Sequence, residues 1–306
     1  WFNNSDGRFN NIEKANTALS EIQNKPFEIS LVEAKEGNEF APKLFDLTSL
    51  QVECNRKHGF PADKTLKLIQ VLYEKKVTTY PRVDTTFLTE DLYPKIPAIL
   101  KGLKAYESLV EPLLSAKIKK TKRVFDNKKV TDHHAIIPTG VPANNLAGDE
   151  KVVYDMVVLR FIAAFYPECK VLKTTVLGLV DSHEFRAVGK QILEPGWRVV
   201  LNSNDDDKSD ENQLMPEFTL GETGQHEPDL QEKETKPPKY FSEATLLRSM
   251  ETAGKQIDDE DLRDALKENG IGRPSTRAGI IETLFKRHYI QRDKKRVLAT
   301  QTGVDL

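Results

Sequence analysis

The sequence predicts an α+β protein in which a helical segment is inserted into a β-rich one. Apolar residues recur at helical spacing within residues 46–167, whereas residues 171–201 form short extended runs broken by glycine and proline. Residues 1–45 mix a short helical pattern with an extended segment. We therefore expect a β-rich domain made of 1–45 and 168–234, a helical domain at 46–167 and a partial, winged-helix-like domain at 235–306.

Composition and charge are those of a globular protein. The chain has 306 residues, of which 38% are hydrophobic and 30% charged, enough for two or three domains. No apolar run is long enough to span a membrane, and neither a signal peptide nor a CxxC motif is present. We therefore expect a cytoplasmic protein whose two cysteines, Cys54 and Cys169, are packed thiols.

The net charge of −2 excludes a strongly basic nucleic-acid-binding protein. Charge is nevertheless uneven, because Lys117–Arg123 and Lys286–Arg296 are basic segments. Local basic surfaces are therefore compatible with the near-neutral total.

The amino-terminal residues are expected to form a helix at Ile12–Ile22 and an extended segment at Phe27–Val32. The chain opens on Trp1 without an initiator methionine and stops at Leu306 without a closing element. From these two ends we expect a fragment of a longer protein.

The helical domain is expected to begin with two capped helices. Thr48 and Gln51 fit a capping box ahead of a helix that ends at Gly59. Asp63 is expected to cap the next helix. The buried face of this second helix is predicted from residues at helical spacing: Leu66, Ile69, Leu72 and Tyr73.

Tyr80 follows the second helix. The β-branched run Val77-Thr78-Thr79 and the proline Pro81 force an extended end there, so Tyr80 is expected where the helix passes into a loop. Two further helices are expected at Glu90–Leu114 and, after an Asp149 cap, at Glu150–Phe165.

The rest of the chain is predicted to be extended first and helical later. Extended runs are expected at Val171–Val180, Phe185–Val188 and Trp197–Leu201, punctuated by Gly178, Gly189 and Pro195-Gly196. Asn202–Gln213 is expected to be a polar acidic linker or an exposed loop.

The last segment is expected to contain a helix capped by Ser242, then a turn at Gly270–Thr276 that opens a second helix reaching about Arg287. A hairpin at Tyr289–Leu298 follows. Helix followed by hairpin is the order found in a winged helix.

The segment Thr79-Tyr80-Pro81-Arg82-Val83-Asp84 places a tyrosine beside an arginine in a loop. A free phenol has a pKa of about 10, so a catalytic tyrosine needs a cation or a metal nearby. Arg82 can supply that charge or hold a phosphate with its planar guanidinium. Taken alone, the segment is more typical of a surface tyrosine beside a solvated arginine.

A second cluster is Asp132-His133-His134-Ala135-Ile136-Ile137-Pro138-Thr139. Neighbouring histidines on a helix point in different directions, so the pair is a poor metal site. One protonated imidazole can instead bind a phosphodiester oxygen or pass a proton to a leaving 3′-oxygen. Structural histidines are the more common alternative.

A third motif is Gly270-Ile271-Gly272-Arg273-Pro274-Ser275-Thr276. Its small residues allow a phosphate to approach, a helix amino terminus attracts anions, and Arg273 adds a formal charge. Ser275 and Thr276 can cap the helix. A glycine turn that leads into a capped helix is also common without any ligand.

Taken together, the three motifs resemble the type IA DNA topoisomerase family, of the bacterial topoisomerase III sort, in their order and spacing. Further segments carry the same resemblance, which spans nearly the whole chain: Leu44–Gln51, Phe161–Phe165 and Tyr240–Leu246.

The resemblance implies a toroidal enzyme that cuts one DNA strand, passes another through the gap and rejoins the cut without ATP. It makes Tyr80 the nucleophile that forms a 5′-phosphotyrosyl link, Arg82 the arginine that supports cleavage, and His133 the histidine at the scissile phosphate. The remaining candidates are expected to bind single-stranded DNA: His134, Arg273, Ser275, Thr276 and Arg277. The parent is expected to be a monomeric, nucleoid-associated bacterial protein without a membrane partner.

The family's magnesium ligands lie in an amino-terminal Toprim domain, as a glutamate after a strand and an Asp-x-Asp-x-Glu cluster. Here the acidic stretches Asp205–Glu211 and Asp258–Asp261 follow Tyr80 and lack flanking buried strands. We interpret them as solvated charge, so Mg²⁺ is expected to bind outside this chain, and the chain alone is expected not to cleave DNA.

Two rival hypotheses remain. A tyrosine recombinase is suggested by the His-x-x-Arg spacing of His183-Glu184-Phe185-Arg186, although neither Tyr240 nor Tyr289 downstream sits in a matching motif. A non-catalytic DNA-binding regulator could be built on residues 242–300. A regulator should prefer a defined duplex, whereas a topoisomerase segment should prefer single strands.

Overall fold

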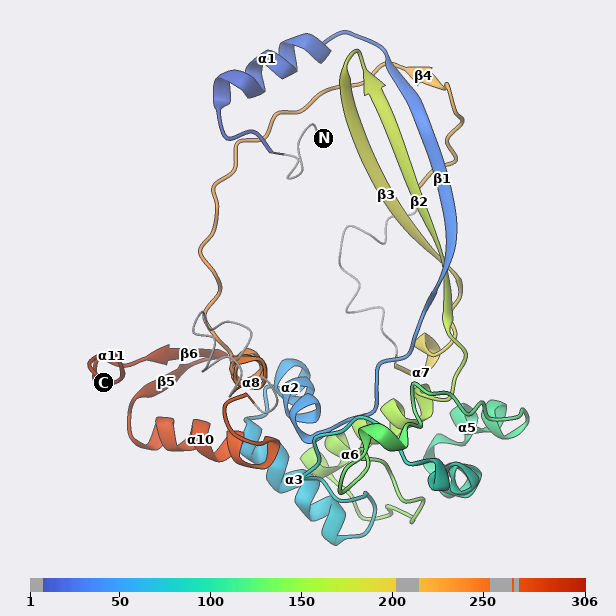
Figure 1. Ribbon diagram of the computed structural model, residues 1–306, viewed down its shortest axis with the longest axis vertical. Coiled ribbons are helices and arrows are strands. Elements are labelled where there is room, and N and C mark those ends of the chain that lie inside the picture. The colour runs from blue at the N-terminus through green and yellow to red at the C-terminus, as the bar shows by residue number, and fades with distance from the viewer. Residues whose placement is uncertain (1–7, 202–214, 254–265, 267–269) are drawn as a thin grey trace. The chain divides into compact units, whose positions relative to one another are not determined.

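A computed structural model of the chain describes residues 8–201, 215–253, 266 and 270–306. It divides into two compact units, Trp1–Ala41 with Pro167–Pro237 and Pro42–Tyr166 with Pro238–Leu306. The first unit holds most of the strands and the second most of the helices (Figure 1). The expected α+β class is confirmed, and the finer division into three domains stays a prediction.

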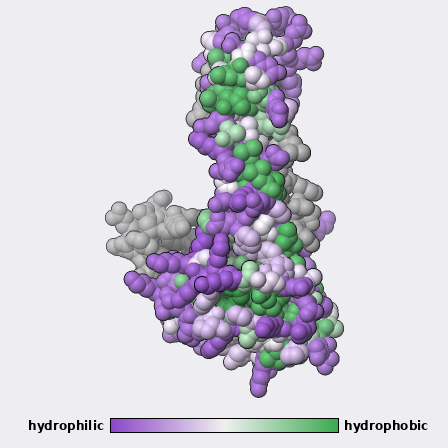
Figure 2. Space-filling view, turned by 90° about the vertical axis from the view of Figure 1, so that its right-hand side faces the viewer, coloured by the Kyte–Doolittle hydropathy of each residue, from purple (hydrophilic) through white to green (hydrophobic). Residues whose placement is uncertain are grey.

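The first unit is built on a four-stranded antiparallel sheet with strand order β3-β2-β1-β4. Its elements are α1 (Ile12–Ile22), β1 (Phe27–Glu39), β2 (Cys169–Val180), β3 (His183–Glu194), α7 (Arg198–Leu201) and β4 (Thr223–Gly224). Figure 2 shows hydrophobic residues along this sheet interspersed with hydrophilic ones, as expected when strand residues alternate between faces. Helix α1 matches the expected Ile12–Ile22, whereas all three long strands extend beyond their expected ends.

Gly178 lies inside β2, within the expected run Val171–Val180; a Cβ there would stand 2.0 Å from the Phe27 ring, so only glycine leaves room for that ring. One sequence interpretation in this unit was wrong. Trp197–Leu201 is not extended. The amides of Arg198 and Val200 donate to the carbonyls of Pro195 and Trp197, which starts the short helix α7.

The second unit contains the remaining elements. They are α2 (Leu47–His58), α3 (Ala62–Glu74), η1 (Glu90–Lys95), α4 (Ile96–Gly102), η2 (Lys104–Tyr106), α5 (Glu107–Leu114), η3 (Asn127–Lys129), α6 (Gly148–Ala163), α8 (Glu243–Glu251), α10 (Pro274–Lys286), β5 (Ile290–Asp293), β6 (Arg296–Ala299) and α11 (Gln301–Val304). The helix starting after Ser242 and the hairpin β5–β6 are confirmed.

The helix expected at Glu90–Leu114 is broken into four short pieces. Gly102 has no room for a side chain, because a Cβ there would lie 2.1 Å from the carbonyl oxygen of Gly140. The next residue, Leu103, has a ψ of 59° and leaves the helical conformation. Close packing against the Gly140 backbone therefore coincides with the break in a pattern that looked continuous in sequence.

Three expected helix caps also differ. Asp46, not Thr48, begins α2, since its Oδ1 accepts from the Ser49 amide at 2.7 Å and its own amide donates to the Ser49 Oγ at 3.1 Å. Asp63 lies within the first turn of α3 and does not cap it. Asp149 likewise lies inside the first turn of α6, whose N-cap is Ala147.

The segment from Pro238 onward packs on helices α2 and α3. Glu243 at the start of α8 accepts a 2.9 Å hydrogen bond from the Ala62 amide and so caps α3 from another helix. Asn55 of α2 accepts one of 3.1 Å from the Ala244 amide. A buried cluster joins α3, α8 and α10: Ala62, Leu247, Met250, Ala278 and Ile281. Burial of each large apolar side chain contributes about 1.5–3 kcal/mol.

The two cysteines, Cys54 and Cys169, are buried and free, as expected. None of the helices in the described part of the chain is long and apolar enough to cross a membrane.

Candidate active site

Tyr80 lies in a loop that follows α3, as the sequence predicted. The helix closes with hydrogen bonds from the Lys76 amide to the Tyr73 carbonyl and from the Val77 amide to the Leu72 carbonyl, with Lys76 at a positive φ of 61°. This left-handed residue turns the chain out of the helix. The residues after Val77 are therefore extended and available to pair with another segment.

The extended residues before Tyr80 pair with the segment that follows the two histidines. The Thr79 amide donates to the Ile137 carbonyl at 2.9 Å, and the Thr139 amide donates to the Val77 carbonyl at 3.1 Å. Thr78 and Pro138 form an antiparallel bridge between these bonds. The register of this short ladder therefore fixes which residues face each other beyond its end.

The Thr79 side chain holds the end of the ladder. Its Oγ1 accepts from the Ile137 amide at 3.0 Å and donates to the Ala135 carbonyl at 3.3 Å. Because the strands are antiparallel, the residue after Thr79 then meets the residues before Ala135. The ring centroids of Tyr80 and His133 lie 4.5 Å apart with their planes at 42°.

A second aromatic ring supports the tyrosine from the helix side. Tyr73, in the last turn of α3, packs edge-on against Tyr80 with centroids 5.5 Å apart. Tyr80 is half-buried and His133 is exposed. The phenol thus stands between a helix-borne ring and an imidazole that solvent, or a ligand, can reach.

Arg82 lies two residues beyond Tyr80 on the exposed side of the loop. Pro81 and Val83 are buried, and the Val83 carbonyl accepts from the Leu47 amide at 3.1 Å. This alternation anchors the loop while Arg82 remains exposed. Within the described residues no carboxylate pairs with its guanidinium, which leaves that charge available for an anion.

His134 differs from its neighbour His133 in position. It is half-buried, and its Nδ1 lies 2.8 Å from the Ala135 carbonyl oxygen. Burial lowers the pKa of His134 below its ordinary value, and the nearby His133 lowers it further. A neutral His134 that donates through Nδ1 attracts a phosphate less than an imidazolium would, so we assign it a lesser part than His133.

The glycine motif forms a tight turn against the end of α8. Gly270 has a φ of +60°, and a Cβ there would lie 2.2 Å from the Met250 carbonyl oxygen, which also accepts from the Ile271 amide at 2.7 Å. Helix α10 starts after Arg273, so the N-cap is Arg273 and not Ser275 or Thr276, whereas Thr276 takes part in the capping as expected. Thr276 closes the turn, since its Oγ1 accepts from the Arg273 amide at 3.0 Å.

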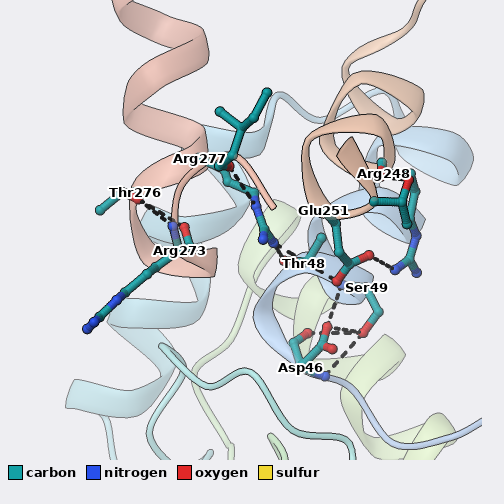
Figure 3. A network of polar contacts seen from close by, with 10 residues as sticks. Asp46, Thr48, Ser49, Arg248, Glu251, Arg273, Thr276 and Arg277 are labelled. Atoms are coloured by element: carbon teal, nitrogen blue, oxygen red, sulfur yellow. Dashed lines mark hydrogen bonds and ion pairs between the residues drawn. The ribbon is translucent and has the colours of Figure 1, made fainter. Parts of the chain in front are cut away.

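Arg277, expected to touch DNA, is only 3% exposed. Figure 3 shows its guanidinium directed into the protein, where Nε donates to the Ile271 carbonyl at 3.2 Å and Nη1 donates to the Thr48 Oγ1 at 3.0 Å. The carboxylate of Glu251 lies 4.0 Å away. These internal bonds favour a structural role, in which Arg277 ties the glycine turn to the start of α2.

Asp46 and Arg248 complete the network of Figure 3, and the sequence reasoning missed both. Arg248 pairs with Glu251 at 2.6 Å. Burial raises the pKa of Asp46, against the lowering effect of its bonds from Ser49, and the charge of Glu251 raises it further. The Asp-x-x-Ser spacing was the available signal, two residues before the capping box that was expected.

Neither a metal site nor a recombinase-like histidine is supported by the described residues. Throughout the described residues no group of three His, Cys, Asp or Glu side chains can hold a metal ion, so these residues do not provide a magnesium site. The acidic stretches Asp205–Glu211 and Asp258–Asp261 lie outside the described residues. His183 is buried and 3.1 Å from Glu21, which favours a structural role.

Comparisons with known proteins agree with the motifs. The family model described as DNA topoisomerase matches residues 1–306. DNA topoisomerase 3 of Bacillus cereus (strain ZK / E33L) is 37% identical over 316 aligned positions, covering 99% of this chain and 43% of that protein. DNA topoisomerase 3 of Vibrio cholerae is 32% identical, covering 97% of this chain and 47% of that protein.

A solved structure shares the fold. Full-length topoisomerase I from Thermotoga maritima superposes with a TM-score of 0.69 and 23% identity, covering 94% of this chain and 45% of that one. The chain thus spans less than half the length of these relatives.

Proposed function

The chain belongs to the type IA DNA topoisomerase family, and we propose that it supplies the tyrosine, Tyr80, with which such an enzyme cuts a DNA strand. The observation that carries the proposal is the 4.5 Å approach of the Tyr80 and His133 rings. Two motifs far apart in sequence meet there, and Arg82 follows on the exposed side of the same loop.

In the proposed reaction the Tyr80 Oη attacks a backbone phosphorus. A bond forms between Oη and phosphorus as the bond to the 3′-oxygen breaks, so the tyrosine carries the 5′-phosphate and the other end becomes a 3′-hydroxyl. The phenol loses its proton and the 3′-oxygen gains one. Attack by the 3′-hydroxyl reverses the step. Because one phosphoester replaces another, no ATP is required.

Arg82 and His133 have complementary parts in this proposal. Arg82 contributes a permanent positive charge that stabilises the phenolate and the developing phosphate charge. His133, when protonated, can bind a phosphate oxygen or pass its proton to the leaving 3′-oxygen. His134 is a secondary DNA contact.

Single-stranded DNA is the proposed partner, held in part by Arg273, Ser275 and Thr276. The amides and positive end of α10 lie beside the exposed Arg273, an arrangement that suits a phosphate. Helix α3, which leads to Tyr80, packs against α10 in the same compact unit. The two DNA-contacting regions would therefore be held together by a shared core.

Magnesium remains part of the proposal, bound by the Toprim domain that the family resemblance implies. The described residues supply no site for it, so no step is assigned to the metal here. We also propose that the enzyme acts as a monomer in the bacterial cytoplasm.

A non-catalytic DNA-binding module is the second candidate, favoured by the helix-then-hairpin order of α10, β5 and β6. It predicts binding without any covalent step, and this separates it from the proposed enzyme.

The proposal is tested by strand cleavage. The natural protein at its full length is incubated with magnesium and an end-labelled single-stranded oligonucleotide, and products are separated after denaturation. Tyr80→Phe should abolish cleavage, whereas Tyr73→Phe, which alters the neighbouring ring, should retain it. Equal cleavage by the Tyr80→Phe variant would refute the assignment, and binding without cleavage by the unaltered protein would favour the second candidate.

A further inference from the structure

A cleft of about 650 Å³ opens beside the loop that carries Tyr80. Residues 84–87 of that loop form one side, and Lys129 and Thr131, just ahead of His133, contribute another. Residues near the start of α2, among them Lys43, line the rest. The cleft is therefore bounded by continuations of both segments that meet at the candidate nucleophile.

Two lysines hold their ammonium groups over one aromatic ring in this cleft. The Nζ of Lys43 lies 5.2 Å and that of Lys129 lies 4.6 Å from the centroid of the Phe87 ring. The two charges are consequently no more than about 10 Å apart, close enough to meet one phosphate or two successive ones. Each cation–π contact helps to hold its ammonium in place.

These lysines have weak carboxylate partners or none. In the part of the chain that the structure describes, no carboxylate pairs with Lys43, and the nearest to Lys129 is Asp126 at 3.8 Å. Both lysines are exposed. Like charges held near each other without counter-charges attract an anion.

The cleft is also lined by two arginines, which both pair with glutamates, and by two aspartates. Arg160 pairs with Glu53 at 2.5 Å, and Arg248 pairs with Glu251 at 2.6 Å. Asp46 and Asp84 also line the cleft, and burial together with the charge of Glu251 raises the pKa of Asp46. The two lysines are thus the cations left to bind a ligand.

We infer that this cleft binds backbone phosphates of the DNA strand on the side that stays attached to Tyr80, with Lys43 and Lys129 as the phosphate-binding cations. The inference rests on the proposed function, in which Tyr80 keeps the 5′-phosphate. The strand that continues from that phosphate leaves from Tyr80, and the cleft begins four residues along the same loop. The hydroxyls of Thr86 and Thr131 add polar groups to the lining.

Such a site would hold the cut end while the gap is open. A covalent link alone fixes one atom of the strand, whereas contacts to the next phosphates also fix its direction. Rejoining requires the 3′-hydroxyl to approach the phosphotyrosine in line. Holding the attached strand in a fixed direction should therefore increase the rate of rejoining.

The first measurement is the salt dependence of binding to a single-stranded oligonucleotide, made in the Tyr80→Phe background so that no covalent product forms. Replacing both Lys43 and Lys129 by alanine should reduce the slope of log K against log salt by about 1.4, from about 0.7 per phosphate contact. The matched control replaces Lys64 and Lys120, which also lie over aromatic rings but outside the cleft, and should leave the slope unchanged.

The second measurement locates the contact along the strand. Neutral methylphosphonate linkages are placed one to three nucleotides on the 5′-phosphate side of the mapped cleavage site, or on the opposite side. On the attached side they should weaken binding of the protein with both lysines and have little further effect in the Lys43→Ala, Lys129→Ala variant. On the opposite side the loss should be the same for both proteins.

An unchanged slope in the double variant, or equal losses from methylphosphonates on the attached side, would overturn the cleft assignment while leaving Tyr80 as nucleophile. A changed slope in the double variant, together with no tyrosyl adduct from the full-length protein that keeps Tyr80, would instead overturn the proposed function. The two failures are therefore distinct.

Discussion

The ring of Tyr80 lies 4.5 Å from that of His133 because Thr79 holds both sides of the contact. The Thr79 hydroxyl accepts from the Ile137 amide and donates to the Ala135 carbonyl, and its own amide donates to the Ile137 carbonyl. The geometry of the candidate nucleophile therefore depends on a side chain with no chemical part in the reaction.

Thr79→Val should damage both stability and cleavage. The substitution keeps the shape but leaves the Ile137 amide without its hydroxyl acceptor, so the free energy of unfolding should fall by about 1–3 kcal/mol. Cleavage should fall further than stability accounts for, because Tyr80 and His133 lose their fixed register. Urea denaturation and a cleavage assay measure the two effects, with Thr79→Ser as the control that keeps the hydroxyl. Full cleavage by a destabilised Thr79→Val protein would contradict this positioning role.

The two adjacent histidines should differ in their effect on the reaction. His133→Ala should slow adduct formation by about 10²–10⁴-fold, the range for loss of a general acid, because His133 contacts the Tyr80 ring. His134→Ala should slow it much less, since the lowered pKa of His134 keeps it neutral near pH 7. Single-turnover rates measured at several pH values compare the variants. If His134→Ala slowed adduct formation more than His133→Ala, the catalytic histidine would be His134.

Arg273 and Arg277 lie one helical turn apart, but replacing Arg273 should weaken DNA binding, whereas replacing Arg277 should lower stability. Arg273 is exposed, so Arg273→Ala should leave stability unchanged and reduce the salt slope of single-strand binding by about 0.7. Arg277 is buried and bonds to Ile271 and Thr48, so Arg277→Met should lower the free energy of unfolding by about 2–3 kcal/mol. Denaturation and salt titration of both variants separate the roles. If the Arg277→Met protein were as stable as the unaltered one but bound DNA more weakly, Arg277 would be a DNA contact and not a structural residue.

Asp46→Asn should remove a pH dependence of stability. Burial raises the pKa of Asp46, so the folded protein holds this proton more tightly than the unfolded chain. The resulting stabilisation is complete below the ordinary pKa of about 3.8 and is lost as the pH rises through the folded-state pKa. Asparagine keeps a cap acceptor for the Ser49 amide but does not ionise.

At neutral pH the Asp46→Asn protein should therefore be at least as stable as the unaltered one, with the difference shrinking in acid. Urea denaturation of both proteins across this pH range measures it. A variant that is less stable at neutral pH and equally stable in acid would show that ionised Asp46 is stabilising.

Local features of the fold followed from the sequence, and contacts between distant segments did not. The β-branched residues and Pro81 correctly predicted that Tyr80 leaves a helix, because they act on the backbone beside them. Nothing within that segment indicated that it pairs with Ile137. The end of β3 was missed because Lys190 to Glu194 is mostly exposed, so the alternation of apolar residues that marks a strand is weak there.

The same limit applies to the helix cap and to Arg277 at the candidate site. Thr48-x-x-Gln51 and Asp46-x-x-Ser49 both fit a capping pattern, and the fold selects the second because the Gln51 side chain is buried and donates to the Ala62 carbonyl at 3.0 Å. Arg277 adjoins a motif that suits phosphate, so the sequence favoured a DNA contact. Its hydrogen bond to Thr48 of α2 joins segments far apart in sequence and could not be predicted from the motif.

The most direct test of Tyr80 as the nucleophile is to identify the residue that becomes joined to DNA. The natural protein at its full length is incubated with magnesium and single-stranded DNA, trapped with denaturant and digested, and the DNA-linked peptide is sequenced by mass spectrometry. We expect the peptide that contains Tyr80, linked through a 5′-phosphate. A link through a 3′-phosphate, or an adduct on another residue such as Tyr73, would contradict the assignment.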